Sequence, residues 1–98
     1  MTPAEREAAH QEIARLATAG VESTYAPALH VAQSVAEHLA ELSALWMARE
    51  SAALAECKEA SPELLGIVAV RAADATARVD LLDELLGSLL ELARGIGV

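Results

Sequence analysis

The chain has 98 residues, enough for one domain, and its 15 acidic residues against 7 basic ones give a net charge of −8. This balance argues against a nucleic-acid-binding protein, which needs a basic surface, and against binding to an anionic membrane surface. Hydrophobic residues make up 54% of the chain but aromatic residues only 2%, so apolar contacts must come from aliphatic side chains, above all from alanine.

The sequence predicts a first helix over residues 3–18. Thr2 can cap it, Pro3 occupies the first helical position, where the missing N–H costs nothing, and Glu5 stands three residues after the cap. Gly20 is typical of the residue that ends a helix. Because the apolar stripe of this segment is narrow, we expect a helix that is mobile or packs on a partner.

Two long helices are predicted next, over residues 24–59 and 62–94. Ser23 or Thr24 can cap the first of them. Ser61 and Pro62 mark the boundary between the two, because proline is favoured at the first helical position. The fold class is therefore all-α. We expect a single domain over residues 1–98, made of a short N-terminal helix and a long antiparallel helical hairpin.

Alanine recurs seven times at a spacing of four within the second helix. The series runs through positions 28, 32, 36, 40, 44, 48 and 52. Residues four apart form an inclined ridge on a helix, and small side chains on such a ridge let two helix axes approach closely. The ridge therefore predicts close packing of this helix against a neighbour.

Apolar residues cover about half of the circumference of both long helices, which is wider than one antiparallel neighbour can cover. A helix of 33 residues is about 50 Å long, whereas a compact domain of this size has a radius of gyration of only about 13 Å. We therefore expect self-association into a homodimer or higher oligomer with a four-helix-type bundle. The predicted interface residues are Val31, Val35, Leu42, Trp46, Leu82, Leu86 and Leu89.

Two arginines of the third helix fall inside the edge of its apolar arc. With a turn near residue 61, antiparallel pairing places Arg71 near Glu50, and Arg78 near Glu41 or Ala44. Either arginine can extend to solvent over a buried stem or pair with a carboxylate of the facing helix. We favour the extended arrangement.

Two groups of polar residues are candidate ligands for a divalent metal or iron. The spacing Glu7-x-x-His10 puts a carboxylate and an imidazole on one helix face, as in ferritin-like carboxylate sites. Glu37, His38 and Glu41 form a second cluster, together with His30. For both groups a solvated helix face is the simpler interpretation, but an oligomer that turned the second group inward would favour a metal site there.

In length, helical-hairpin architecture, alanine content and acidity, the chain resembles the small secreted helical-hairpin proteins that carry a Trp-x-Gly motif in the interhelical turn. Here Trp46-Met47-Ala48 lacks the glycine and lies within a predicted helix, while the turn signal is at Ser61 and Pro62. The resemblance is confined to architecture, so it implies no function for this chain.

The sequence shows no spacing typical of a catalytic nucleophile and no phosphate-binding glycine loop, so an enzyme is not the favoured interpretation. With the single Cys57 and no signal-peptide pattern, we expect a cytoplasmic protein, and export without a leader stays open. The leading hypothesis is a non-enzymatic helical interaction protein, such as a scaffold, adaptor or small chaperone, that acts as a homo-oligomer and has no cofactor. The alternatives are a metal-binding or ferroxidase-like bundle and an acidic inhibitor that docks on a basic partner.

Overall fold

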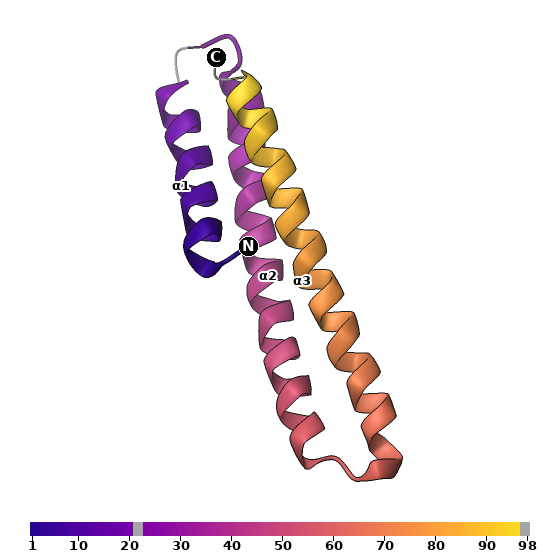
Figure 1. The fold of residues 1–98 in the computed structure, drawn as a ribbon. Coiled ribbons are helices and arrows are strands. Elements are labelled where there is room, and N and C mark those ends of the chain that lie inside the picture. The colour runs from indigo at the N-terminus through magenta and orange to yellow at the C-terminus, as the bar shows by residue number, and fades with distance from the viewer. Residues whose placement is uncertain (21–22, 97–98) are drawn as a thin grey trace.

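The computed structural model describes residues 1–20 and 23–96, and within them it contains three helices and no strand. They are α1 (Pro3–Ala19), α2 (Ala26–Glu59) and α3 (Pro62–Ile96) (Figure 1). The all-α prediction is confirmed, and so is the division into a short first helix and a long antiparallel hairpin. Helix α2 begins two residues later than predicted and α3 ends two residues later.

The start of α1 is fixed by a reciprocal pair of hydrogen bonds. The amide of Glu5 donates to Thr2 Oγ1 over 3.1 Å, and the amide of Thr2 donates to Glu5 Oε1 over 3.1 Å. At the other end, the amide of Gly20 donates to the carbonyl of Leu16 over 2.9 Å. A Cβ at position 20 would overlap the side chain of Leu29, so a glycine there lets the chain turn closely against α2.

The predicted cap of α2 is wrong. Among the described residues no side chain caps this helix, and its N-cap is Tyr25. The hydroxyl of Ser23 instead accepts the amide of Tyr25 over 3.1 Å, which stabilises a turn just before the helix. Pro27 lies in the first turn of α2, where the absent N–H needs no partner.

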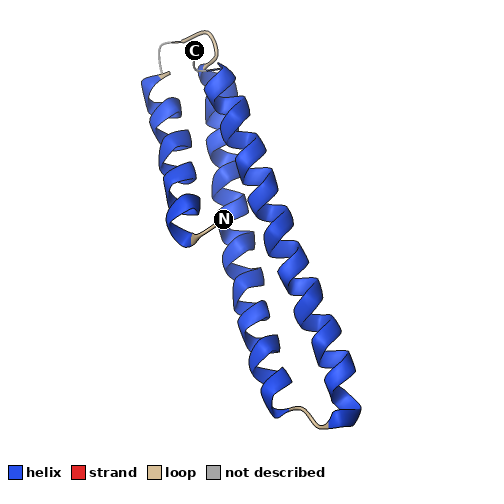
Figure 2. Cartoon of the chain, viewed as in Figure 1, coloured by secondary structure: helices blue, strands red, loops and turns tan. Residues whose placement is uncertain are grey.

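The hairpin is long and only partly covered. The molecule measures 60 × 17 × 16 Å with a radius of gyration of 17.3 Å, against about 13 Å for a compact domain of this size. Helix α1 has 17 residues and the hairpin helices have 34 and 35, so α1 lies along one half of the hairpin (Figure 2). We call residues 48–76 the turn half, because only α2 and α3 are present there.

The main hydrophobic core lies where all three helices meet. Ile13 and Leu29 are at most 2% exposed. The other buried members of this core are Ala9, Ala17, Ala32, Ala36, Leu39, Leu82, Leu86 and Ala93. In the turn half, the buried apolar residues are Ala53, Val68, Ala72 and Ala75, so the two helices approach each other there over small side chains.

The alanine ridge of α2 packs less extensively than predicted. Of its seven members, all of which are described, Ala32 and Ala36 are buried and the other five are exposed. A ridge with a spacing of four turns by about 40° per step, so it leaves any one helix interface after a few residues. The prediction of close packing therefore holds for the segment beneath α1 and is wrong beyond it.

The hairpin register also differs from the prediction. Arg71 pairs with Glu56 over 3.4 Å rather than with Glu50, and Glu50 instead accepts the hydroxyl of Thr76 over 2.6 Å. Arg78 pairs with Asp74 on its own helix over 3.1 Å, and not with Glu41. The turn lies where the sequence places it, so the difference arises because side chains reach along the helix axis as well as across it.

A buried carboxylate anchors α1 to α3. Asp83 is 7% exposed, and Arg6 donates to it twice, from Nε over 2.7 Å and from Nη2 over 3.0 Å. The ammonium group of Met1 adds a third contact over 3.2 Å. Burial disfavours the charged carboxylate, but the hydrogen bonds from Arg6 and Met1 outweigh this effect and hold the pKa of Asp83 below its ordinary value of 3.8.

We predict that Asp83→Asn lowers the free energy of unfolding by about 2 kcal/mol, because it leaves the half-buried Arg6 guanidinium without its charged partner. The control is Asp74→Asn, the same chemical change in the exposed pair with Arg78, which should cost less than about 0.5 kcal/mol. Chemical denaturation of the three proteins at neutral pH measures both. Equal losses for the two variants would contradict the anchoring role of Asp83.

The contribution of Asp83 should also depend on pH. Because its pKa is lower in the folded than in the unfolded chain, the carboxylate stabilises the fold above pH 3.8, and this contribution is lost as the pH falls through the folded-state pKa. The stability gap between the natural chain and Asp83→Asn is therefore constant from pH 7 to about 5 and narrows below about 4. A gap that persists unchanged in acid would show that the ion pair contributes nothing.

Candidate protein interface

Helix α1 covers one groove of the hairpin and leaves the opposite one open. On α3, Asp83 binds Arg6, and the nearest side-chain atom to a Cβ built on Gly87 belongs to Met1, at 3.7 Å. On α2, Ser43 and Met47 line a groove together with residues of α1. At 100° per residue, Leu81 and Leu85 lie about 160° around α3 from Asp83, on the side away from α1.

That uncovered side carries a row of exposed apolar side chains on both long helices. We call these six residues the open face, and their exposed fractions range from 43% to 62%. At 100° per residue, the members on each helix fall within about 80° of one another. The open face consists of Val31, Val35 and Leu45 on α2 and Leu81, Leu85 and Leu92 on α3.

The seven residues predicted to form an interface divide into two groups. Val31 and Val35 are exposed and belong to the open face. Leu82 and Leu86 are 8% and 3% exposed and lie in the core of the single chain. Leu42, Trp46 and Leu89 are partly buried and pack against that core from the side of the open face. Whether any of the seven contacts a partner stays a prediction.

Four residues of the open face were missing from the predicted interface, namely Leu45, Leu81, Leu85 and Leu92. The sequence signal for three of them is present, since Leu81, Leu85 and Leu92 widen the apolar arc of the third helix. Which edge of that arc is covered depends on where α1 lies, and the position of α1 is set by the pairing of Arg6 with Asp83 across 77 residues.

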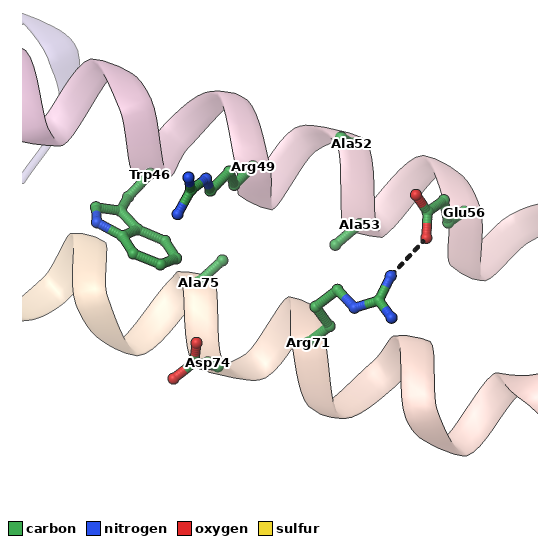
Figure 3. A pocket seen from close by; sticks show the side chains of 8 residues that line it. All are labelled: Trp46, Arg49, Ala52, Ala53, Glu56, Arg71, Asp74 and Ala75. Carbon is green, nitrogen blue, oxygen red and sulfur yellow. Dashed lines mark hydrogen bonds and ion pairs between the residues drawn. The ribbon is translucent and has the colours of Figure 1, made fainter.

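Next to the open face, the seam between α2 and α3 changes from apolar to charged. A groove of about 420 Å³ is lined by the residues that Figure 3 shows. We call it the arginine groove, and its residues are Trp46, Arg49, Ala52, Ala53, Glu56, Arg71, Asp74 and Ala75. Alanines form its floor, while Arg71 reaches across it to Glu56 (Figure 3).

Trp46 lies at the boundary between the open face and the arginine groove. The guanidinium carbon of Arg78 is 4.2 Å from the centre of its ring and that of Arg49 is 4.6 Å away. Both distances are within the range of a cation–π contact, which contributes about 0.5–1 kcal/mol at an exposed site. Three of the 7 basic residues of the chain, Arg49, Arg71 and Arg78, are thus gathered along this side of the hairpin, in a protein of net charge −8.

The predicted metal ligands are not brought to one site within the single chain. His38 and Glu41 are 3.8 Å apart, but their side chains are 71% and 81% exposed. Glu7 accepts a hydrogen bond from Gln11, and His10 and Glu37 line a shallow groove between α1 and α2. Across residues 1–20 and 23–96, no group of three or more His, Cys, Asp or Glu side chains could hold a metal ion.

Comparison with protein-family models, with curated proteins and with solved structures found no match to this chain. Within the part of the chain that the structure describes, no helix has the length and hydropathy needed to cross a membrane.

Proposed function

We propose that this chain is a non-enzymatic helical interaction protein, of the scaffold, adaptor or small-chaperone kind, that acts as a homo-oligomer through the open face. The observation that carries the proposal is the position of the six exposed apolar residues. They lie on the side of the hairpin that α1 leaves uncovered.

The extent of the open face supports the same conclusion. From their exposed fractions, its six residues present on the order of 500 Å² of surface, which is near the upper end of the largest apolar patch of a typical monomeric protein. The largest apolar patch of a monomeric protein is often functional. A hairpin laid into this groove would complete a four-helix arrangement, in which each helix buries the apolar arc that one neighbour cannot cover.

The two alternative functions have less support. A metal-binding bundle needs several inward carboxylates and histidines at matched heights, whereas the described residues of the single chain bring together no group of three or more such side chains. An acidic inhibitor needs its carboxylates gathered on one exposed surface, whereas the acidic residues of this chain occur along all three helices. Neither arrangement accounts for the open face.

We predict that Leu85→Glu weakens self-association at least about 100-fold. In a symmetric dimer each substitution counts twice, so two apolar contacts are lost and two carboxylates are left in an apolar interface. Sedimentation equilibrium should show a dimer or higher oligomer for the natural chain at micromolar concentration and a folded monomer for the variant.

The matched control is Leu54→Glu. Leu54 is 50% exposed and Leu85 is 47% exposed, but Leu54 lies in the turn half, outside the open face. This variant should associate as the natural chain does. The proposal would be contradicted by a natural chain that stays monomeric at about 100 micromolar. It would also be contradicted if the two substitutions weakened self-association equally.

A further inference from the structure

We infer that the open face is filled by a second copy of this chain, which lies antiparallel to the first and overlaps only its α1-covered half. The inference rests on the proposed self-association and adds its geometry. It follows from the shape of the open face along the hairpin and from the charges that adjoin it.

The open face is self-complementary. Its residues on α2 run from Val31 to Leu45, with a midpoint at position 38, and those on α3 run from Leu81 to Leu92, with a midpoint between 86 and 87. Trp46 meets Arg78 and Glu50 meets Thr76 across the hairpin, so positions whose numbers sum to about 124–126 lie at one height. The two midpoints therefore share a height, and a two-fold axis through it superimposes apolar on apolar residues.

A second copy can face the first in two symmetric ways. In the parallel arrangement both turns lie at the same end and the hairpins overlap along their whole length. In the antiparallel arrangement the turns lie at opposite ends, the open faces cover each other, and the two turn halves project on either side. Both arrangements bury the open face. They differ in whether the arginine groove is buried as well.

The parallel arrangement would bury the arginine groove against a second arginine groove. Each groove brings the charged side chains of Arg49, Arg71, Glu56 and Asp74. The side chains of Arg71 and Glu56 are 64% and 55% exposed, and removing such charges from water costs several kcal/mol per ion. The antiparallel arrangement leaves both in water, together with the exposed Ile67 and Val70 of the turn half.

The antiparallel arrangement also accommodates His38, a polar residue that lies among the apolar residues of the open face. His38 lies at the midpoint of the α2 segment, beside Glu41, and would meet the same pair of the second copy at the two-fold axis. A polar pair at the centre of an apolar helix interface fixes the register, because any shift would place it against leucine or valine. The surface that the antiparallel dimer would bury is also of the expected size. Two open faces and their polar rims together present an area on the order of the 1,200–2,000 Å² that stable interfaces typically bury.

The distance between the two turns tests this geometry. The turn lies about 33 Å along the axis from the midpoint at 1.5 Å per residue, so labels at the two turns should be about 65 Å apart in the antiparallel dimer. In the parallel dimer they should be about 10–20 Å apart, which is one or two helix spacings. Glu59→Cys in a Cys57→Ala background, with a spin label at position 59, allows double electron–electron resonance to measure the distance.

A second label position separates the failure of this inference from that of the proposed function. Ser34 lies at the rim of the open face near its midpoint, so a label on Ser34→Cys gives a distance below about 30 Å in either dimer. Short distances at both positions 34 and 59 would overturn the antiparallel arrangement and keep the dimer. No dipolar coupling at either position, with a monomer in sedimentation, would overturn both and assign the open face to a different protein.

Substitution in the arginine groove gives an independent test. Arg71→Glu places a second carboxylate beside that of Glu56. Both positions lie outside the overlap of the antiparallel dimer, so the dissociation constant of that dimer should change less than about threefold. The parallel dimer would bury that pair of like charges and should weaken more than about tenfold. A loss of association comparable to that of Leu85→Glu would overturn the antiparallel arrangement.

Discussion

The difference in length between α1 and the hairpin governs the rest of the structure. Helices α2 and α3 have apolar arcs too wide for a single neighbour, and α1, with 17 residues, fills one groove along one half of their length. The hairpin therefore has three kinds of surface: a groove covered by α1, the open face behind it, and a turn half where two helices pack alone. Each kind has its own composition.

Leucine and alanine are buried in different parts of the hairpin. Where three helices meet, leucines such as Leu29, Leu82 and Leu86 fill the space between the axes. In the turn half, three of the four buried apolar residues are alanines, Ala53, Ala72 and Ala75, and their small side chains permit close contact without the volume for a thick core. A seam of alanine buries little area per residue, so the turn half gains less from the hydrophobic effect and is the part of the hairpin that opens at the lowest free-energy cost.

The sequence predicts the helices well because their signals are local. Thr2, Pro3 and Glu5 mark the start of α1, and Ser61 and Pro62 mark the turn. The surface that each helix presents is not local. The covered edge of α3 depends on Asp83, and the residues around Asp83 in the sequence give no sign of the Arg6 side chain that neutralises it. The interface prediction was therefore centred on residues such as Leu86, which α1 and α2 bury.

The ion pair between Arg6 and Asp83 also explains why α1 leaves the open face uncovered. Asp83 is a carboxylate on the edge of an otherwise apolar arc, and a charge there is tolerated only opposite a cation. Arg6 supplies the cation and carries α1 with it, so α1 packs on the Asp83 edge of α3 and not on the edge formed by Leu81 and Leu85. That second edge is apolar and stays uncovered, because α1 packs on the Asp83 edge, where the ion pair adds to the burial of Ile13. A polar interaction inside the chain thus leaves an apolar surface exposed.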